Sequence, residues 1–271
     1  MLRLSSRAVL FTAAALAGLP ASAAPTVYFG EDLGAASAAN LTNSSAARAA
    51  FVGQLTGVAT ENFEGFTGGQ LFPGAGLLFA GSPVTATISG GTIRDVPFNA
   101  RFAVDGTNYL DSSFNRRITF LSPVAAFGLF VIDANENNNN PATVTVNGQL
   151  LTPADIDARP FDSVDGIFRI VTERSAGVFE TLFNGGTFPA RDSSGMFVGL
   201  IDAANPFSNI VLINGTSGLD VAFQDGFGYD LLTTGTPVAA IPEPETYALL
   251  LAGLAAVGAA ARRRKEKGCP R

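Results

Sequence analysis

The side chains that could perform chemistry in this chain are mainly its carboxylates, because the sequence contains no histidine. Without histidine, Ser-His-Asp and Cys-His nucleophilic sites are excluded, and so is histidine-ligated zinc. Residues 24–240 contain no lysine, which also excludes a phosphate-binding loop that ends in Gly-Lys-Ser/Thr. Cys269 is the only cysteine, so an intramolecular disulfide cannot form.

Carboxylates alone could support glycoside hydrolysis, which needs two acids placed on either side of a sugar. Four glutamates of the central region are available for such a pair: Glu61, Glu64, Glu173 and Glu180. Nothing in their spacing brings any two of them together. We therefore predict that the chain is not an enzyme and contains no catalytic residues.

One polar stretch has the oxygen-rich composition that Ca²⁺ prefers. Asp133, Asn135 and Glu136 follow an apolar run and precede four consecutive asparagines. The stretch lacks the spacing and the central glycine of an EF-hand loop, so a solvated loop is the simpler interpretation. These three residues are the candidate metal ligands if the chain binds Ca²⁺, and no other cofactor is predicted. A second acidic group has no regular ligand spacing; it comprises Asp155, Asp157, Asp162 and Asp165.

The elements that would position these acids are predominantly β-strands. After residue 60, short alternating or β-branched runs recur between glycine-rich turns, which is typical of antiparallel strands. The predicted strands cover residues 84–88, 117–121, 124–132, 143–146, 149–151, 166–171, 196–201, 210–213, 221–223 and 227–232. Asn147-Gly148 predicts a hairpin turn between two of them.

About ten strands, no long amphipathic helix and 30 glycines predict an all-β fold, an antiparallel β-sandwich of jelly-roll type. We expect the sandwich to begin near residue 60, with the Ala-rich segment 24–59 packed on it and a short helix over residues 45–52. Aromatic and aliphatic side chains from the strands should form the core, namely Phe120, Phe127, Phe130, Phe168, Phe197 and Ile210.

The charge of this central region argues against nucleic acid as a partner. Residues 24–240 contain nine arginines and 20 acidic residues, which gives a formal charge of −11. Nucleic-acid binding depends on basic residues that neutralise phosphates. The chain's basic cluster instead follows an apolar stretch near residue 260, where the tendency of basic residues to stay on the cytoplasmic side of a membrane accounts for it.

Both ends of the sequence have the composition of targeting segments. Residues 1–23 combine Arg3 and Arg7 with an apolar core, and small residues at Ala21 and Ala23 predict signal-peptidase cleavage. At the other end, residues 233–240 are predicted to be a linker. Residues 241–271 then contain Pro242-Glu243-Pro244, an uncharged stretch at 246–261 and the basic residues Arg262, Arg263, Arg264 and Lys265. The uncharged stretch is predicted to be a short transmembrane helix.

This order, a Pro-Glu-Pro motif followed by an apolar helix and then a basic cluster that would stop transfer through the membrane, resembles the PEP-CTERM sorting tail of exported bacterial proteins. The resemblance implies recognition by an exosortase, a membrane protease-transferase. It also implies insertion in the inner membrane, followed by delivery to the cell surface or the extracellular space after processing.

For residues 24–232, the predicted exported domain, two non-catalytic functions stay open, and a glycosidase with two converging carboxylates is the third alternative. The first is a non-catalytic surface or matrix protein associated with exopolysaccharide. The alternative is a carbohydrate-binding module on the same sandwich, which would bind sugar through acidic loop residues and could use Ca²⁺ to do so. The absence of tryptophan and the low number of tyrosines count against this module, because such modules commonly present exposed aromatic rings.

Overall fold

The computed structural model describes residues 25–71, 76–79, 82–88, 90–112, 116–134, 150–151, 168–186, 193–213, 226–238, 253–255 and 257. Several predicted features lie outside these residues. They are the signal peptide with Ala21 and Ala23, the motif Pro242-Glu243-Pro244, the basic residues Arg262 to Lys265, the candidate ligands Asn135 and Glu136, and the acids between 155 and 165.

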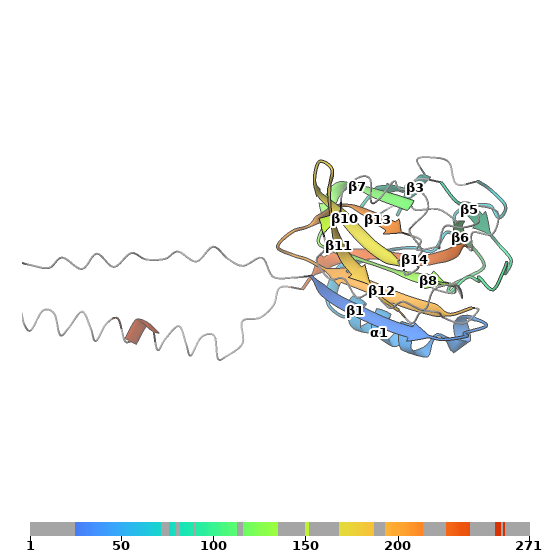
Figure 1. Ribbon diagram of the computed structural model, residues 1–271, viewed down its shortest axis with the longest axis horizontal. Helices are drawn as coiled ribbons and strands as arrows, with labels where there is room; N and C mark the ends of the chain where they lie inside the picture. The colour runs from blue at the N-terminus through green and yellow to red at the C-terminus, as the bar shows by residue number, and fades with distance from the viewer. Residues whose placement is uncertain are drawn as a thin grey trace, which may run out of the picture. The chain divides into compact units, whose positions relative to one another are not determined.

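The described strands form two sheets of seven strands each, which face one another (Figure 1). Sheet A has the order β1 (Thr26–Asp32), β12 (Gly195–Ile201), β8 (Ala126–Ile132), β14 (Phe227–Pro237), β6 (Tyr109–Ser112) and β5 (Thr92–Arg94), and β2 (Leu55–Glu61) also pairs with β14. Sheet B has the order β3 (Gly76–Leu78), β4 (Ala86–Ile88), β7 (Arg116–Val124), β13 (Phe207–Ile213), β10 (Arg169–Ser175), β11 (Val178–Asn184) and β9 (Leu150–Leu151). The two antiparallel sheets confirm the all-β prediction, whereas the jelly-roll connectivity stays a prediction.

The main core lies between the two sheets, and alternation along each strand explains its composition. In the middle of β7, for example, side chains alternate between the interior and the surface, so Ile118 and Phe120 are buried while Thr119 and Leu121 are exposed. Four of the six predicted core residues belong to this interior cluster, namely Phe120, Phe127, Phe168 and Ile210. Their burial confirms the prediction.

A second core lies on the opposite face of sheet A, under the helix α1 (Thr42–Val52). Phe130 and Phe197 are buried as predicted, but they pack here beside Phe51 of α1 instead of between the sheets. Strands β8 and β12 are thus covered by sheet B on one face and by α1 on the other, which is why their sequences are continuous apolar runs. Figure 1 shows α1 lying along β1 and β12.

The N-terminal segment contributes more to the fold than packing alone. The predicted helix is confirmed, but residues 26–32 and 55–61 form strands β1 and β2 of sheet A, which the prediction of a sandwich beginning near residue 60 missed. Asp32 at the end of β1 accepts hydrogen bonds from the backbone N–H groups of Asn43 and Ser44 and from the Ser44 hydroxyl. Asp32 therefore caps α1 from a neighbouring strand, which the local sequence of the helix does not reveal.

The prediction of a linker from residue 233 is wrong for residues 233–237, because they continue strand β14. Thr233 and Thr234 are fully buried and donate their hydroxyl hydrogens to the carbonyl groups of Leu231 and Ala126. These bonds allow threonine, a good strand former, to lie where an apolar residue is expected. By its internal contacts, the first compact unit of the chain extends to Thr236, and a second begins at Pro237. We call the first of these the folded unit.

Few residues of the predicted transmembrane stretch are described. Residues 253–255 and 257 are helical, and Leu254 and Val257 are exposed. Within the described part of the chain, no helix reaches the length and apolar character needed to cross a membrane.

Candidate functional site

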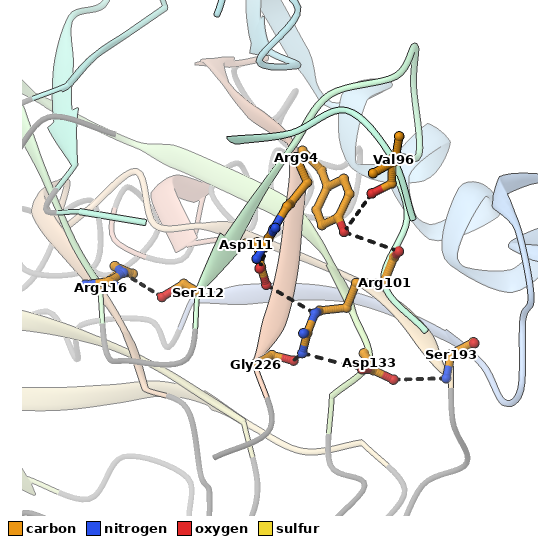
Figure 2. Close-up of polar contacts among 10 residues, drawn as sticks. Arg94, Val96, Arg101, Asp111, Ser112, Arg116, Asp133, Ser193 and Gly226 are labelled. Carbon is orange, nitrogen blue, oxygen red and sulfur yellow. Dashed lines mark hydrogen bonds and ion pairs between the residues drawn. The ribbon is translucent and has the colours of Figure 1, made fainter. Parts of the chain in front are cut away.

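A buried polar site in the described structure is centred on the guanidinium group of Arg101 (Figure 2). Its Nε lies 3.1 Å from Oδ1 of Asp111, and one of its terminal nitrogens lies 3.7 Å from Oδ2 of Asp133. The same terminal nitrogen donates to the carbonyl of Gly226. Arg94 pairs with the second oxygen of Asp111 at 3.0 Å. We call these two arginines and two aspartates the Arg101 cluster; its formal charges cancel.

The position of the Arg101 cluster follows from the strand order. Asp111 lies on β6, Asp133 directly follows β8, and Gly226 directly precedes β14. Strand β12 also begins here, because Ser193 donates its backbone N–H to Oδ1 of Asp133 at 3.0 Å. The strands β12, β8, β14 and β6 are consecutive in sheet A. Arg101 therefore holds together the ends of four neighbouring strands.

A buried tyrosine supports the loop that carries Arg101. The hydroxyl of Tyr109 donates toward the carbonyl groups of Val96 and Arg101, at 3.4 and 3.3 Å. Burial, and secondarily the nearby charge of Asp111, raises the pKa of Tyr109 to about 12. The hydroxyl therefore stays protonated and able to donate at neutral pH.

The structure describes one of the three candidate Ca²⁺ ligands. Asp133 is 1% exposed, has a positive φ of 68°, and uses its carboxylate to bind Ser193 and Arg101. Arg101 thus already supplies a cation beside this carboxylate. Among the described residues, no group of three or more acidic or cysteine side chains is arranged to hold a metal ion. The other two candidate ligands lie outside the described residues, so both the solvated loop and the alternative of a calcium site stay predictions.

Another buried acid, Asp230, lies on the face of sheet A that carries α1, since it pairs with Phe130 of β8. Its carboxylate is fully buried and accepts three backbone hydrogen bonds, from Val104, Asp105 and Leu231 at 2.6–3.0 Å. Burial raises the pKa of Asp230 to about 7, although the three N–H donors act in the opposite direction. The sequence predicted a strand over residues 227–232, which contains Asp230, without indicating this environment.

We expect the stability of the folded unit to decrease as the pH rises from about 5 to 7. Because the pKa of Asp230 is higher in the folded than in the unfolded chain, the folded state holds a proton that the unfolded state has released. This contribution is fully present below pH 4, the range of an ordinary carboxyl group, and is lost as the pH rises through 7. Its slope approaches about 1.4 kcal/mol per pH unit.

Urea unfolding of the wild-type chain and of Asp230→Asn across this pH range measures the effect. The difference in free energy of unfolding between the two should change with pH, then level off above about pH 8. A difference that is constant from pH 5 to 8 would contradict the raised pKa.

The four glutamates considered for glycoside hydrolysis each serve the local structure. The carboxylate of Glu61 accepts the N–H groups of Phe63 and Phe79, both of which have positive φ. Glu64 accepts those of Thr107 and Asn108. Glu173 on β10 pairs with Arg117 on β7, two strands away in sheet B, and Glu180 on β11 pairs with Arg174 on the neighbouring strand β10.

Sequence reasoning missed the role of Arg101. Its neighbours Asn99 and Ala100 form a turn with positive φ, and no periodic pattern marks Arg101 as buried. The one available signal was a shortage of cations: in an acidic region without lysine, arginines are the only cationic side chains that can pair with a buried acid.

Comparison with known proteins gives one result. No curated protein and no solved structure matches the chain. The family model described as the PEP-CTERM protein-sorting motif matches residues 240–265, which include Pro242-Glu243-Pro244, the uncharged stretch and the basic residues. The predicted resemblance is confirmed: the chain carries a PEP-CTERM protein-sorting motif.

Proposed function

We propose that the chain is an exported, non-catalytic protein of the cell surface or extracellular matrix, delivered by its PEP-CTERM motif and associated with exopolysaccharide. The observation that carries this proposal is the motif match at residues 240–265. In this function, an exosortase-like enzyme recognises the tail while its apolar stretch holds the protein in the inner membrane. Processing then releases the folded unit toward the surface.

The use of charged side chains in the folded unit supports a structural function. Arg174 contacts Glu180, Asp202 and the carbonyl of Asn205, and its guanidinium lies over the ring of Phe207. Arg117 likewise combines an ion pair to Glu173 with a position over Phe179. Together with the Arg101 cluster, these arrangements commit charged groups to holding strands and loops. A catalytic site would instead need acids directed at a substrate.

The chain connects the folded unit to the motif through few residues. Strand β14 ends at Pro237, so residues 238–241 alone separate it from Pro242. Proline lacks an N–H donor and disfavours helix in the preceding residue, so the triplet is suited to interrupt regular structure between a strand and an apolar helix.

The double substitution Pro242→Ala/Pro244→Ala should abolish processing of the full chain in a host that contains the sorting system. We expect the unprocessed protein to accumulate in the inner-membrane fraction, with its C-terminal peptide, including Arg271, intact by mass spectrometry. Pro270→Ala is the matched control, because it alters a proline of the same tail outside the matched residues. Wild-type processing of the double variant would refute recognition of this motif.

The association with exopolysaccharide has its own test. In a host unable to make exopolysaccharide, the processed protein should move from the cell-associated matrix to the culture medium. Retention on the cells would argue against this partner. Saturable binding of the protein to one defined polysaccharide would replace the structural function with a carbohydrate-binding module, and release of reducing sugar would establish an enzyme.

A further inference from the structure

Strand β1 is a long edge strand of sheet A. It stands first in the strand order and, among the described strands, pairs with β12 alone. Its register with β12 continues without interruption from Thr26 to Asp32, whereas the pairings of β10 with β11, β13 with β7, and β14 with β8 contain register shifts. A regular edge strand offers backbone groups with which a further strand can pair.

The other edges of the two sheets are short or irregular. Strands β5 and β3 have three residues each, and the described part of β9 has two. Strand β2 is as long as β1, but Gly57 within it has a φ of 59°, which breaks the regular strand conformation. Short length, bulges, proline and charged side chains, lysine above all, are the usual protections against edge pairing. Strand β1 has seven residues and contains no lysine, proline or bulge, and its two charged residues, Glu31 and Asp32, are confined to one end.

Strand β1 also leaves apolar side chains exposed. Val27 and Phe29 are each 43% exposed and lie on the same face, since side chains two residues apart share a face. The ring of Phe29 contacts that of Phe183 on sheet B, with 5.3 Å between ring centroids. The interior of the sandwich therefore reaches the molecular surface at this edge, where another strand could cover it.

We propose that a second copy of this chain pairs with β1 in antiparallel orientation, with the two-fold axis at Phe29. Phe29 is the central residue of β1, so this register pairs all seven residues and places the two Phe29 side chains opposite each other. The acidic residues Glu31 and Asp32 then face Val27 and Thr26 of the other copy. A parallel pairing in register would instead oppose like charges, which is unfavourable.

Two contacts from α1 to the carbonyl groups of β1 must be compatible with the pairing. The side-chain amide of Asn43 donates to the carbonyl of Glu31 at 3.1 Å, and the hydroxyl oxygen of Ser44 lies 3.2 Å from the carbonyl oxygen of Gly30. A carbonyl oxygen has two lone pairs and can accept a second hydrogen bond, so neither contact blocks the proposed register. The proposal depends on the folded unit alone and is independent of the sorting function.

Cysteine cross-linking of the full chain tests the register. In a Cys269→Ser background, Phe29→Cys should form a disulfide-linked dimer, because opposed residues of antiparallel strands lie about 4.5–5.5 Å apart between Cα atoms, within disulfide range. Val27→Cys should not cross-link, since the two substituted positions would lie four residues apart along the strands, about 14 Å. Equal cross-linking at both positions would indicate random collision and overturn the proposal.

Light scattering of the full chain in detergent tests the association itself. We expect the mass of a dimer, and Val27→Lys should raise its dissociation constant at least tenfold by placing a charge at the pairing edge. Val58→Lys is the matched control, because Val58 is 41% exposed on β2 and should leave the dimer unchanged. A monomeric wild-type protein, or equal weakening by both lysines, would overturn the proposal.

Discussion

Replacing Arg101 with methionine should lower the free energy of unfolding by about 3–5 kcal/mol, the range measured when one partner of a buried ion pair is removed. Arg101 is 3% exposed and is shared between Asp111 and Asp133. Methionine preserves much of the side-chain volume, so the loss reports chiefly the charge. The variant leaves Asp133 buried without its cation and removes a donor from the carbonyl of Gly226. Urea unfolding followed by circular dichroism measures the change.

Arg94→Met is the control for this prediction. Arg94 also pairs with Asp111, but its side chain is 32% exposed, so solvent screens the interaction and its loss should cost about 1 kcal/mol or less. A combined Arg101→Met/Asp133→Asn variant should recover part of the lost stability, because the carboxylate that loses its cation is removed, whereas Asp111 keeps its pair with Arg94. Equal losses for Arg101→Met and Arg94→Met would show that Arg101 does not organise the strand ends.

The sequence predicted the strands whose side chains follow a simple pattern. Residues 196–201 and 126–132 are continuous apolar runs because sheet B covers one of their faces and α1 the other. The end of β14 was missed because Thr233 and Thr234 are polar, and their burial depends on hydrogen bonds to Leu231 and Ala126. Such bonds are formed by the tertiary structure, so local sequence patterns do not predict them.

The sorting motif was predicted from the sequence and the Arg101 cluster was missed, because the two depend on different kinds of information. The sorting motif depends on the order of residues along the chain, which a sequence contains in full, and its prediction is confirmed. The Arg101 cluster brings together positions 94, 101, 111 and 133, and only the strand order makes them neighbours. Asp133 was noticed as a possible metal ligand, but its arginine partner lies 32 residues earlier in the chain.

Two glycines create the surface on which α1 packs. Gly128 and Gly199 are opposite each other on β8 and β12, and the ring of Phe51 lies against both. A Cβ atom added at Gly199 would lie 2.6 Å from the Phe51 ring and 3.0 Å from the Phe197 ring. Neither ring can withdraw easily, because Phe51 also contacts Tyr28, and Phe197 contacts Phe130.

Gly199→Val should therefore lower the free energy of unfolding by about 1–3 kcal/mol, the usual cost of overfilling a packed core, by pushing α1 away from sheet A. Gly65→Ala is the control: a Cβ atom there meets nothing within 4 Å, and the change should be nearly neutral. Phe51→Leu in the Gly199→Val background should cost less than Phe51→Leu in the wild type, since it relieves the collision. Strictly additive losses in this double-mutant cycle would mean that Gly199 and Phe51 do not contact each other in solution.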